Sequence, residues 1–458
     1  MATANPAAGI WSRPNRAMVP GLPPLRQALL LGVLAFLAWR ITALGVATLQ
    51  VAALDSRGEA AARRALDWYP GQAEALYRLG VSLLREDVGR AEALLQEAYL
   101  ANPTDPAPLQ VLAGVALARE DSQRADLLIQ QVDALRPVNP QIQRDLGRYW
   151  LERGRGDLAF HHWSRAIQAN PGLAPGLFET FRALLKDPGM GEAFAAITRD
   201  PPAWWLDFFA DTATRGQEVE TLRLLYRLRR DSVDAPLTLA ERQQYLQRLL
   251  REGLYREAYL AWVNSLNAAQ RQQLGYLFNG GFEVPLTGLG FDWRIAKSDR
   301  VEIGRAAFEG DKRQALRVRF RLMRTPFDHL SQPLLLSPGA YEVAGTYRGV
   351  ELMTDEGFRW VARCRVPDHT LLGESERIFS AETWTSFRFQ IEVPESCVYQ
   401  ELRLVSAAGP TAETTTDGEL WFDELSLQRI DGLSPQARAR IEAARWEEQG
   451  PKPGAVPR

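Results

Sequence analysis

The sequence predicts a multidomain α + β protein in which an N-terminal transmembrane helix is followed by an α-solenoid and a C-terminal antiparallel β-sandwich. Three observations lead to this fold class. A long apolar run lies near the N-terminus, prolines recur at a constant spacing in the middle of the chain, and apolar residues alternate with polar ones towards the C-terminus. With 458 residues, the chain is long enough for two or three domains.

The apolar run extends from Gln27 to Leu54 and contains one charged residue, Arg40. About 20 apolar residues suffice to cross a bilayer, so residues 27 to 47 are long enough. Arginines precede the run, and no acidic residue occurs before Asp55. This charge distribution predicts a cytoplasmic N-terminus and an exported remainder. We therefore expect a flexible cytoplasmic leader at 1–25 and a single-pass anchor at 26–54.

Arg40 complicates this assignment, because an arginine at the centre of a span costs roughly 2.5–3.5 kcal/mol. In a span of residues 27–47, Arg40 lies near the outer third, where its side chain can reach the headgroups. The alternatives are a cleaved signal peptide with Ala28–Trp39 as its apolar core, and a buried helix of a soluble protein. The retained anchor is our prediction.

Charge and cysteine content narrow the possible partners and compartments. The formal net charge of −2 argues against a nucleic-acid partner, which requires a basic surface. The only two cysteines, Cys364 and Cys397, are too few for a disulfide scaffold or a four-cysteine metal site. They either form a disulfide in an oxidising compartment or remain separate buried thiols, and the sequence leaves both possibilities open.

A helical repeat is predicted by prolines at positions 70, 103, 137 and 171, which are successively 33, 34 and 34 residues apart. Small residues recur with the same period, and so do bulky residues in the second half of each unit. The small residues are Gly80, Ala113 and Gly147, and the bulky ones are Leu95, Ile129 and Trp163. A small residue lets two antiparallel helices approach closely, and proline ends the second helix before the next unit begins.

This pattern resembles the tetratricopeptide repeat family, and the resemblance covers roughly Arg57 to Ala174. We expect a tetratricopeptide array at 55–174 and a diverged helical extension at 175–278, in which Leu239–Leu266 forms a further helical pair. Solenoids of this kind present a surface that holds a protein partner.

A β-sandwich is predicted at 279–430, because the hydrophobic period changes to two after Asn279. Alternation of this kind indicates antiparallel strands with one buried and one wet face. It is clearest in three segments, which are Leu316–Leu322, Phe358–Val366 and Phe387–Val393. A short helix, 435–449, and a mobile tail are expected within the last segment, 431–458.

The sandwich resembles the jelly-roll modules of carbohydrate-binding and galactose-binding-like families. The matching segments are the opening 279–283, the strand 314–320, a hairpin at 336–348, the strand 384–393 and the closing 418–425. The resemblance implies a structural calcium ion held by Glu283 and Asp423, with carbonyl groups of the turn 309–312 as further ligands. Alternatively, these acids form a salt bridge or are exposed to solvent. We expect that the protein requires no cofactor.

Two kinds of side chain are candidates for glycan binding. Trp293 and Tyr399 are the aromatic residues that we expect to be exposed. Arginines on strands are expected to form one basic sheet face for carboxylated or sulfated glycans, because guanidinium groups pair bidentately with such anions; they are Arg317, Arg319, Arg321, Arg359, Arg363 and Arg388. A solvated face balanced by neighbouring acids is the alternative.

The sequence has no phosphate loop, no G-x-S-x-G elbow, no H-E-x-x-H helix and no C-x-x-C pair, so we expect no catalytic activity. The combination of anchor, repeats and sandwich resembles tetratricopeptide proteins associated with bacterial exopolysaccharide assembly. It implies a scaffold on the periplasmic side of the inner membrane that binds protein partners, and whose sandwich either binds polysaccharide or caps the last helix of the solenoid. The competing hypothesis is a glycan-binding protein or carbohydrate-active enzyme with the helices as a spacer.

Overall fold

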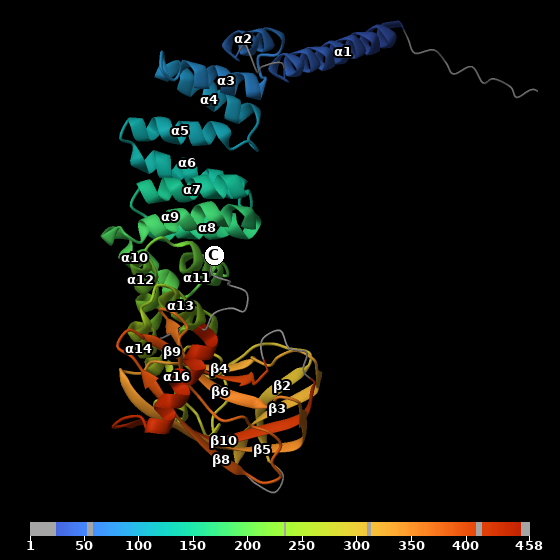
Figure 1. The fold of residues 1–458 in the computed structure, drawn as a ribbon. Helices are drawn as coiled ribbons and strands as arrows, with labels where there is room; N and C mark the ends of the chain where they lie inside the picture. Colours follow the sequence, from blue (N-terminus) through green and yellow to red (C-terminus); the bar gives the residue numbers. More distant parts are fainter. Residues whose placement is uncertain (1–23, 53–57, 233–234, 309–312, 409–414, 450–458) are drawn as a thin grey trace, which may run out of the picture. The chain divides into compact units, whose positions relative to one another are not determined.

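The computed structural model describes residues 24–52, 58–232, 235–308, 313–408 and 415–449. It divides into two compact units, Met1–Ala174 and Pro175–Arg458. The predicted leader lies almost entirely outside the described residues, as do the turn 309–312 and the tail after Gln449. The helical repeats and the antiparallel β-sandwich are present as expected (Figure 1).

The first unit begins with a 29-residue helix, α1 (Pro24–Ala52). Its segment Ala28–Gln50 is long and apolar enough to cross a membrane, a property that signal sequences share. The large apolar side chains between Leu29 and Trp39 are 47–70% exposed. This part of α1 therefore has no protein partner within the described structure that covers it.

The three predicted hairpins follow after α2, and each pairs two antiparallel helices (Figure 1). The helices of this unit are α2 (Gly58–Trp68), α3 (Ala73–Leu83), α4 (Val88–Ala101), α5 (Ala107–Ala118), α6 (Ser122–Leu135), α7 (Pro140–Glu152) and α8 (Gly156–Ala169), with a short 3-10 helix, η2 (Pro171–Leu173). Asp87 and Asp121 cap α4 and α6 by accepting hydrogen bonds from backbone N–H groups of the first turn.

The small-to-large contact predicted for each repeat is seen most clearly between α7 and α8. A Cβ atom on Gly147 would lie 2.4 Å from the ring of Trp163, and one on Gly80 would lie 3.0 Å from Leu95. The glycines therefore provide the space into which the bulky residue of the second helix packs.

The core of the helical part of the second unit contains a buried ion pair among its apolar side chains. Arg229 and Glu241 are 2% and 1% exposed, and their side chains are 2.6 Å apart. Trp205 donates a further hydrogen bond of 2.8 Å to Glu241. The helices, including the predicted pair α13 and α14, are α9 (Ala174–Leu184), η3 (Pro188–Met190), α10 (Gly191–Arg199), α11 (Trp205–Arg215), α12 (Val219–Arg230), α13 (Leu239–Arg251), α14 (Tyr255–Ser265) and α15 (Ala268–Gln272).

Two five-stranded antiparallel sheets form the sandwich, in the orders β1-β4-β9-β6-β7 and β2-β3-β10-β5-β8. The strands are β1 (Arg294–Ile295), β2 (Val301–Ala307), β3 (Gln314–Met323), β4 (Leu330–Leu334), β5 (Gly339–Thr354), β6 (Phe358–Val366), β7 (Leu371–Glu374), β8 (Thr385–Val393), β9 (Tyr399–Ser406) and β10 (Thr416–Ile430). The hairpin expected at 336–348 is wrong, because residues 339–354 form the single long strand β5. This strand lies between β10 and β8, so both of its edges are paired along much of its length.

The last helix, α16 (Pro435–Gln449), packs against β7 and β8. Arg445 donates a 2.7 Å hydrogen bond to the carbonyl oxygen of Leu371, and Arg440 lies 3.1 Å from the carboxylate of Glu376. The helix therefore packs beside the outermost strand of each sheet, where an unpaired edge can attract other chains.

Candidate functional site

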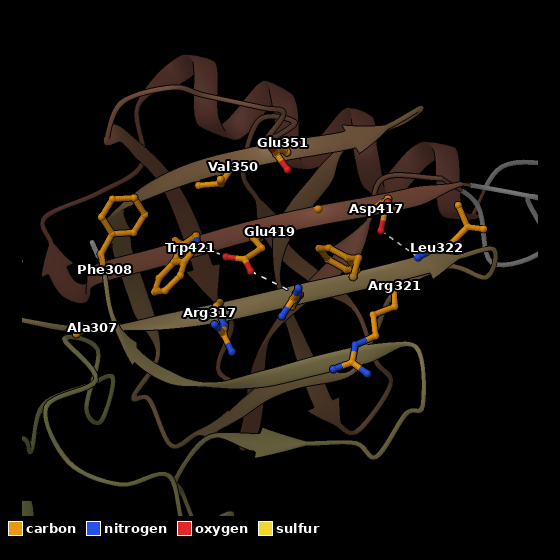
Figure 2. Close-up of a pocket in the computed structure, with 13 residues that line it drawn as sticks. Ala307, Phe308, Arg317, Arg321, Leu322, Val350, Glu351, Asp417, Glu419 and Trp421 are labelled. Carbon is orange, nitrogen blue, oxygen red and sulfur yellow. Dashed lines mark hydrogen bonds and ion pairs between the residues drawn. The ribbon is translucent and has the colours of Figure 1, made fainter. Parts of the chain in front are cut away.

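A groove of about 890 Å³ crosses the outer face of the sheet β2-β3-β10-β5-β8 (Figure 2). Alternation along β3 places Leu316, Val318 and Phe320 in the core and the intervening arginines outside. β10 does the same with Leu420 and Phe422 inside and Trp421 outside. The groove is thus built by the period-two pattern of two adjacent strands.

Residues aligned across the strands form the floor of the groove. Arg319 of β3 lies opposite Glu419 of β10, and Arg317 lies opposite Trp421. The guanidinium group of Arg317 is 5.8 Å from the centre of the Trp421 ring, within cation–π range. The indole N–H of Trp421 donates a 3.0 Å hydrogen bond to Glu419. These contacts fix the orientation of the indole ring.

An aromatic cluster closes one end of the groove (Figure 2). Phe308 packs edge-on against Trp421 and Trp384, with ring centres 5.1 and 5.7 Å apart. Arg348 of β5 lies 4.4 Å from the centre of the Phe308 ring. At this end the half-buried Phe308 supplies apolar carbon to the lining of the groove, and Arg317 supplies a guanidinium group.

The opposite end of the groove is formed by unusual backbone. Leu322, Glu351 and Gly418 have φ angles of 46°, 49° and 97°, and they come from three adjacent strands. Asp417 accepts a 3.1 Å hydrogen bond from the backbone N–H of Leu322. A Cβ atom on Gly418 would lie 2.2 Å from the carbonyl oxygen of Glu351. Bulges of this kind redirect side chains at a binding surface.

The charges of the groove are balanced, so the predicted basic face is wrong. Glu302 of β2 lies 3.3 Å from Arg317 and 3.0 Å from Arg321, and Glu419 lies 3.6 Å from Arg319. The structure instead agrees with the alternative expected from the sequence, in which neighbouring acids balance the arginines of this sheet face. The lining also includes Glu351 and Asp417, so the groove offers hydrogen-bond donors along β3 and acceptors along β10 and β5.

The other three arginines lie elsewhere. Arg388 is on β8, separated from β3 by β10 and β5, and lines a smaller cavity beside α16. Arg359 and Arg363 are on β6 of the other sheet, where Arg359 pairs with Glu374 at 2.7 Å. Alternation alone shows that all six face outwards, but it does not reveal to which sheet each strand belongs.

The two aromatic residues proposed as a glycan platform are buried, so this prediction is also wrong. Trp293 is 0% exposed, and its ring packs against Phe282 and Trp360 in the sandwich core. Tyr399 is 8% exposed and stacks on Tyr255 of α14, with ring centres 4.5 Å apart. Both stabilise the fold because their large apolar rings fill space between elements.

The aromatic residue that the sequence interpretation overlooked is Trp421. The signal was present, because Trp421 occupies the outward position between Leu420 and Phe422, both 0% exposed. Its side chain is nevertheless only 5% exposed, since Arg317 and Phe308 pack against it.

Glu283 and Asp423, the predicted calcium ligands, both lie near Gly281, 3.8 and 4.0 Å from the position that a Cβ atom on this residue would take. Burial raises the pKa of Asp423, and the negative charges of Glu424 and Glu283 raise it further. The hydrogen bond donated by the backbone N–H of Glu424 and the charge of Arg313 lower it in part. Among the described residues, no group of three or more acids, histidines or cysteines is arranged to hold a metal ion. The two carboxylates fit a cation, but the third element, the turn 309–312, lies outside the described residues, so calcium stays a prediction.

Cys364 and Cys397 form a disulfide with a Cα–Cα distance of 5.7 Å. Of the two possibilities left open by the sequence, the structure therefore contains the paired one. The bond joins the end of β6 to the segment that leads into β9.

No protein-family model matches the chain, and no curated protein matches it. Among solved structures, "CBM4 structure and function" has 12% identity and a TM-score of 0.27, and the match covers 34% of this chain and 99% of that one. TmCBM61 in complex with β-1,4-galactotriose has 17% identity and a TM-score of 0.24, with 34% and 99% covered. Pseudomonas aeruginosa PilF has 17% identity and a TM-score of 0.29, with 50% and 100% covered. Similarities this low do not assign a function, which has to come from the geometry of the groove.

Proposed function

We propose that the protein is a non-catalytic, membrane-tethered scaffold whose helical hairpins dock protein partners and whose sandwich groove binds a glycan chain. The observation that carries the glycan part is the groove across β3 and β10, with paired arginines and acids beside an aromatic cluster. Sugar hydroxyl groups both donate and accept hydrogen bonds, and sugar C–H faces pack on apolar carbon. A groove with both kinds of polar group and an aromatic end suits such a ligand.

The charge balance favours a neutral glycan over an acidic one. An acidic chain would have to displace Glu302 from Arg317 and Arg321, whereas a neutral chain can bond to the pairs as they stand. This replaces the carboxylated or sulfated ligand expected from the sequence.

The scaffold role is supported by the stacked hairpins and by α1. Arrays of helical hairpins leave extended surfaces that hold a polypeptide segment. In this proposal the apolar part of α1 anchors the protein in the inner membrane with its bulk in the periplasm; the length of the apolar segment and the distribution of charge around it support this orientation. The proposed setting is the assembly or export of an exopolysaccharide or envelope glycan.

A glycan array probed with the full chain in detergent tests the groove. We expect binding to neutral oligosaccharides that weakens about tenfold in Arg321→Ala, because a charge-assisted hydrogen bond is lost from a side chain that is already 61% exposed. Arg388→Ala, on the far strand of the same sheet, is the matched control and should bind as the wild type does. Equal binding by the wild type and Arg321→Ala would show that the groove is not the glycan-binding site.

The competing enzyme hypothesis is tested by incubating the array's bound glycans with the same protein and measuring reducing ends. We expect none to be released. In the groove, Glu419 is engaged by Arg319 and Trp421, and Asp417 by the backbone of Leu322, so these carboxylates already have structural partners. Release that is lost in Glu419→Gln would establish an enzyme instead.

A further inference from the structure

The last part of α1 packs as a component of the repeat array. Ala43 and Ala47 are 1% and 0% exposed, in contrast to the apolar side chains earlier in the same helix. Ala47 belongs to a core cluster with Ala61, Ala62 and Ala65 of α2, to which α3 and α4 also contribute. One face of the second half of α1 is therefore in the folded core of the first unit, while Ile41, Leu44 and Leu49 on its other faces are exposed.

The position of Ala47 matches the repeat register. It precedes Gly80 by 33 residues, and Gly80 precedes Ala113 by the same distance, so Ala47 occupies the small-residue position. Ala62 of α2 likewise precedes the bulky Leu95 by 33 residues. In this first pair of helices, alanine occupies both the small-residue position of α1 and the bulky-residue position of α2. The two helices can therefore approach each other closely. The end of α1 and α2 thus form one more hairpin of the array.

Arg40 lies seven residues before Ala47, where α1 contributes to the core of the repeat array. Its guanidinium group lies 5.0 Å from the centre of the Tyr69 ring, just after the end of α2. Trp39 and Trp68 are 55% and 49% exposed. Aromatic residues and snorkelling arginines are typical of the membrane–water interface. The exposed ion pair of Arg63 with Glu59 on α2 requires water rather than lipid.

We infer that α1 is retained in the mature protein as one continuous helix, which anchors the chain in the bilayer and, through the face that carries Ala43 and Ala47, serves as the first helix of the repeat array. Cleavage near residues 51–53, as for a signal peptide, would remove Ala43 and Ala47 and leave the alanine face of α2 open to solvent. The array accordingly starts at the membrane surface and is joined to the anchor by helix. This inference rests on the tether in the proposed function.

The N-terminus of the protein from the membrane fraction provides the first test. Intact mass and terminal peptides should show a chain that includes Arg26 and Arg40. A mature N-terminus between residues 51 and 58 would overturn the inference. Failure of the tether itself looks different, because an intact chain would then appear in the soluble fraction.

Packing of α1 on α2 is tested with two leucine variants of the detergent-solubilised full chain. Ala47→Leu forces three extra carbon atoms into the buried cluster, whereas Thr48→Leu places the same side chain one position further on, where the helix is exposed. Trypsin cleavage after Arg63 or Arg64 requires local opening of α2, so Ala47→Leu should speed it about tenfold or more.

Thr48→Leu is the matched control and should leave the cleavage rate unchanged. The hydroxyl group that it removes bonds only to the carbonyl oxygen of Leu44 within α1, so no contact with α2 is lost. Equal rates in both variants would show that α1 does not support α2, whatever the N-terminal mass.

Discussion

At the scale of single residues, His161 and His162 show how one step along a helix changes the chemistry of a side chain. His161 is exposed, whereas His162 is 5% exposed and its Nδ1 lies 2.8 Å from Gln143 Oε1. Burial lowers the pKa of His162 to about 4, helped by His161 and Arg165 and opposed by Asp133. His162 is therefore neutral in the folded array at neutral pH.

This burial predicts an acid-sensitive array. In the unfolded chain the pKa of His162 is about 6.5, so between pH 6.5 and 4 the unfolded state binds a proton that the folded state does not. With respect to this histidine, the free energy of unfolding is therefore highest above pH 6.5. It decreases by about 3 kcal/mol as the pH falls towards 4. Urea unfolding followed by circular dichroism should show this pH dependence reduced in His162→Gln. The adjacent His161→Gln is the control, and an identical pH profile in His162→Gln would refute the assignment.

A substitution of Asp423 tests whether this carboxylate binds calcium or is a buried acid without a cation. Without a metal, burial and the neighbouring acids disfavour its charge, so Asp423→Asn should raise the melting temperature of the sandwich in EDTA. With calcium bound, the same substitution removes a ligand, and the variant should lose the rise in melting temperature that calcium gives the wild type. A wild-type melting temperature that is the same in calcium and EDTA would dismiss the ion.

At the scale of secondary-structure elements, the close contact of α7 with α8 depends on a single glycine. Gly147→Ala would put a methyl group 2.4 Å from Trp163 and should cost about 1–3 kcal/mol. Gly114→Ala on α5 meets nothing within 4 Å and should instead stabilise its helix by up to about 1 kcal/mol. Opposite signs of the two changes in the free energy of unfolding are expected. Two stabilising alanines would mean that the hairpins pack more loosely than described.

Much of this architecture was predictable, because the decisive signals are local or periodic. The constant spacing from Gly80 to Gly147 defined the hairpins, and alternation along β3 identified its inner and outer sides. The pairing of strands was not predictable, because it depends on contacts between distant segments. For this reason Arg359 and Arg317 were assigned to one face although they lie on different sheets.

The candidate site was predicted less well than the fold, for a related reason. Exposure of an aromatic side chain depends on what packs over it, which the sequence does not show. Trp293 is covered by the sandwich core and Tyr399 by α14, and Trp421, although it faces outwards from its strand, is covered by Arg317 and Phe308. Arg317, Arg319 and Arg321 were identified correctly as outward-facing. Glu302, which pairs with Arg317 and Arg321, comes from β2, whose register was unknown.

At the scale of the whole molecule, the disulfide links local structure to the compartment in which the chain folds. Cys397 precedes Tyr399 by two residues, and Tyr399 stacks on Tyr255 of α14, so the bond lies next to the contact between helices and sandwich in the second unit. A disulfide that closes a 33-residue separation stabilises a domain by about 3–4 kcal/mol in the chain-entropy description. Such bonds persist in oxidising compartments and are rare in the cytosol.

The orientation proposed for α1 therefore predicts the redox state of the protein in cells. If the chain after α1 is exported, Cys364 and Cys397 should resist alkylation in acid-quenched cells and react only after a reductant is added. The double variant Cys364→Ala/Cys397→Ala should fold with a free energy of unfolding lower by about 3–4 kcal/mol, and reductant should have no further effect on it. A variant without the residues before Asp55 should stay in the cytosol and carry two free thiols. Because it also lacks Ala43 and Ala47, it is a control for the thiols of the second unit and not for the stability of the first. Reactive thiols in the full-length protein would place the sandwich on the cytosolic side. The fold brings the two cysteines close enough to form the disulfide, so only a reducing compartment would keep them apart as thiols.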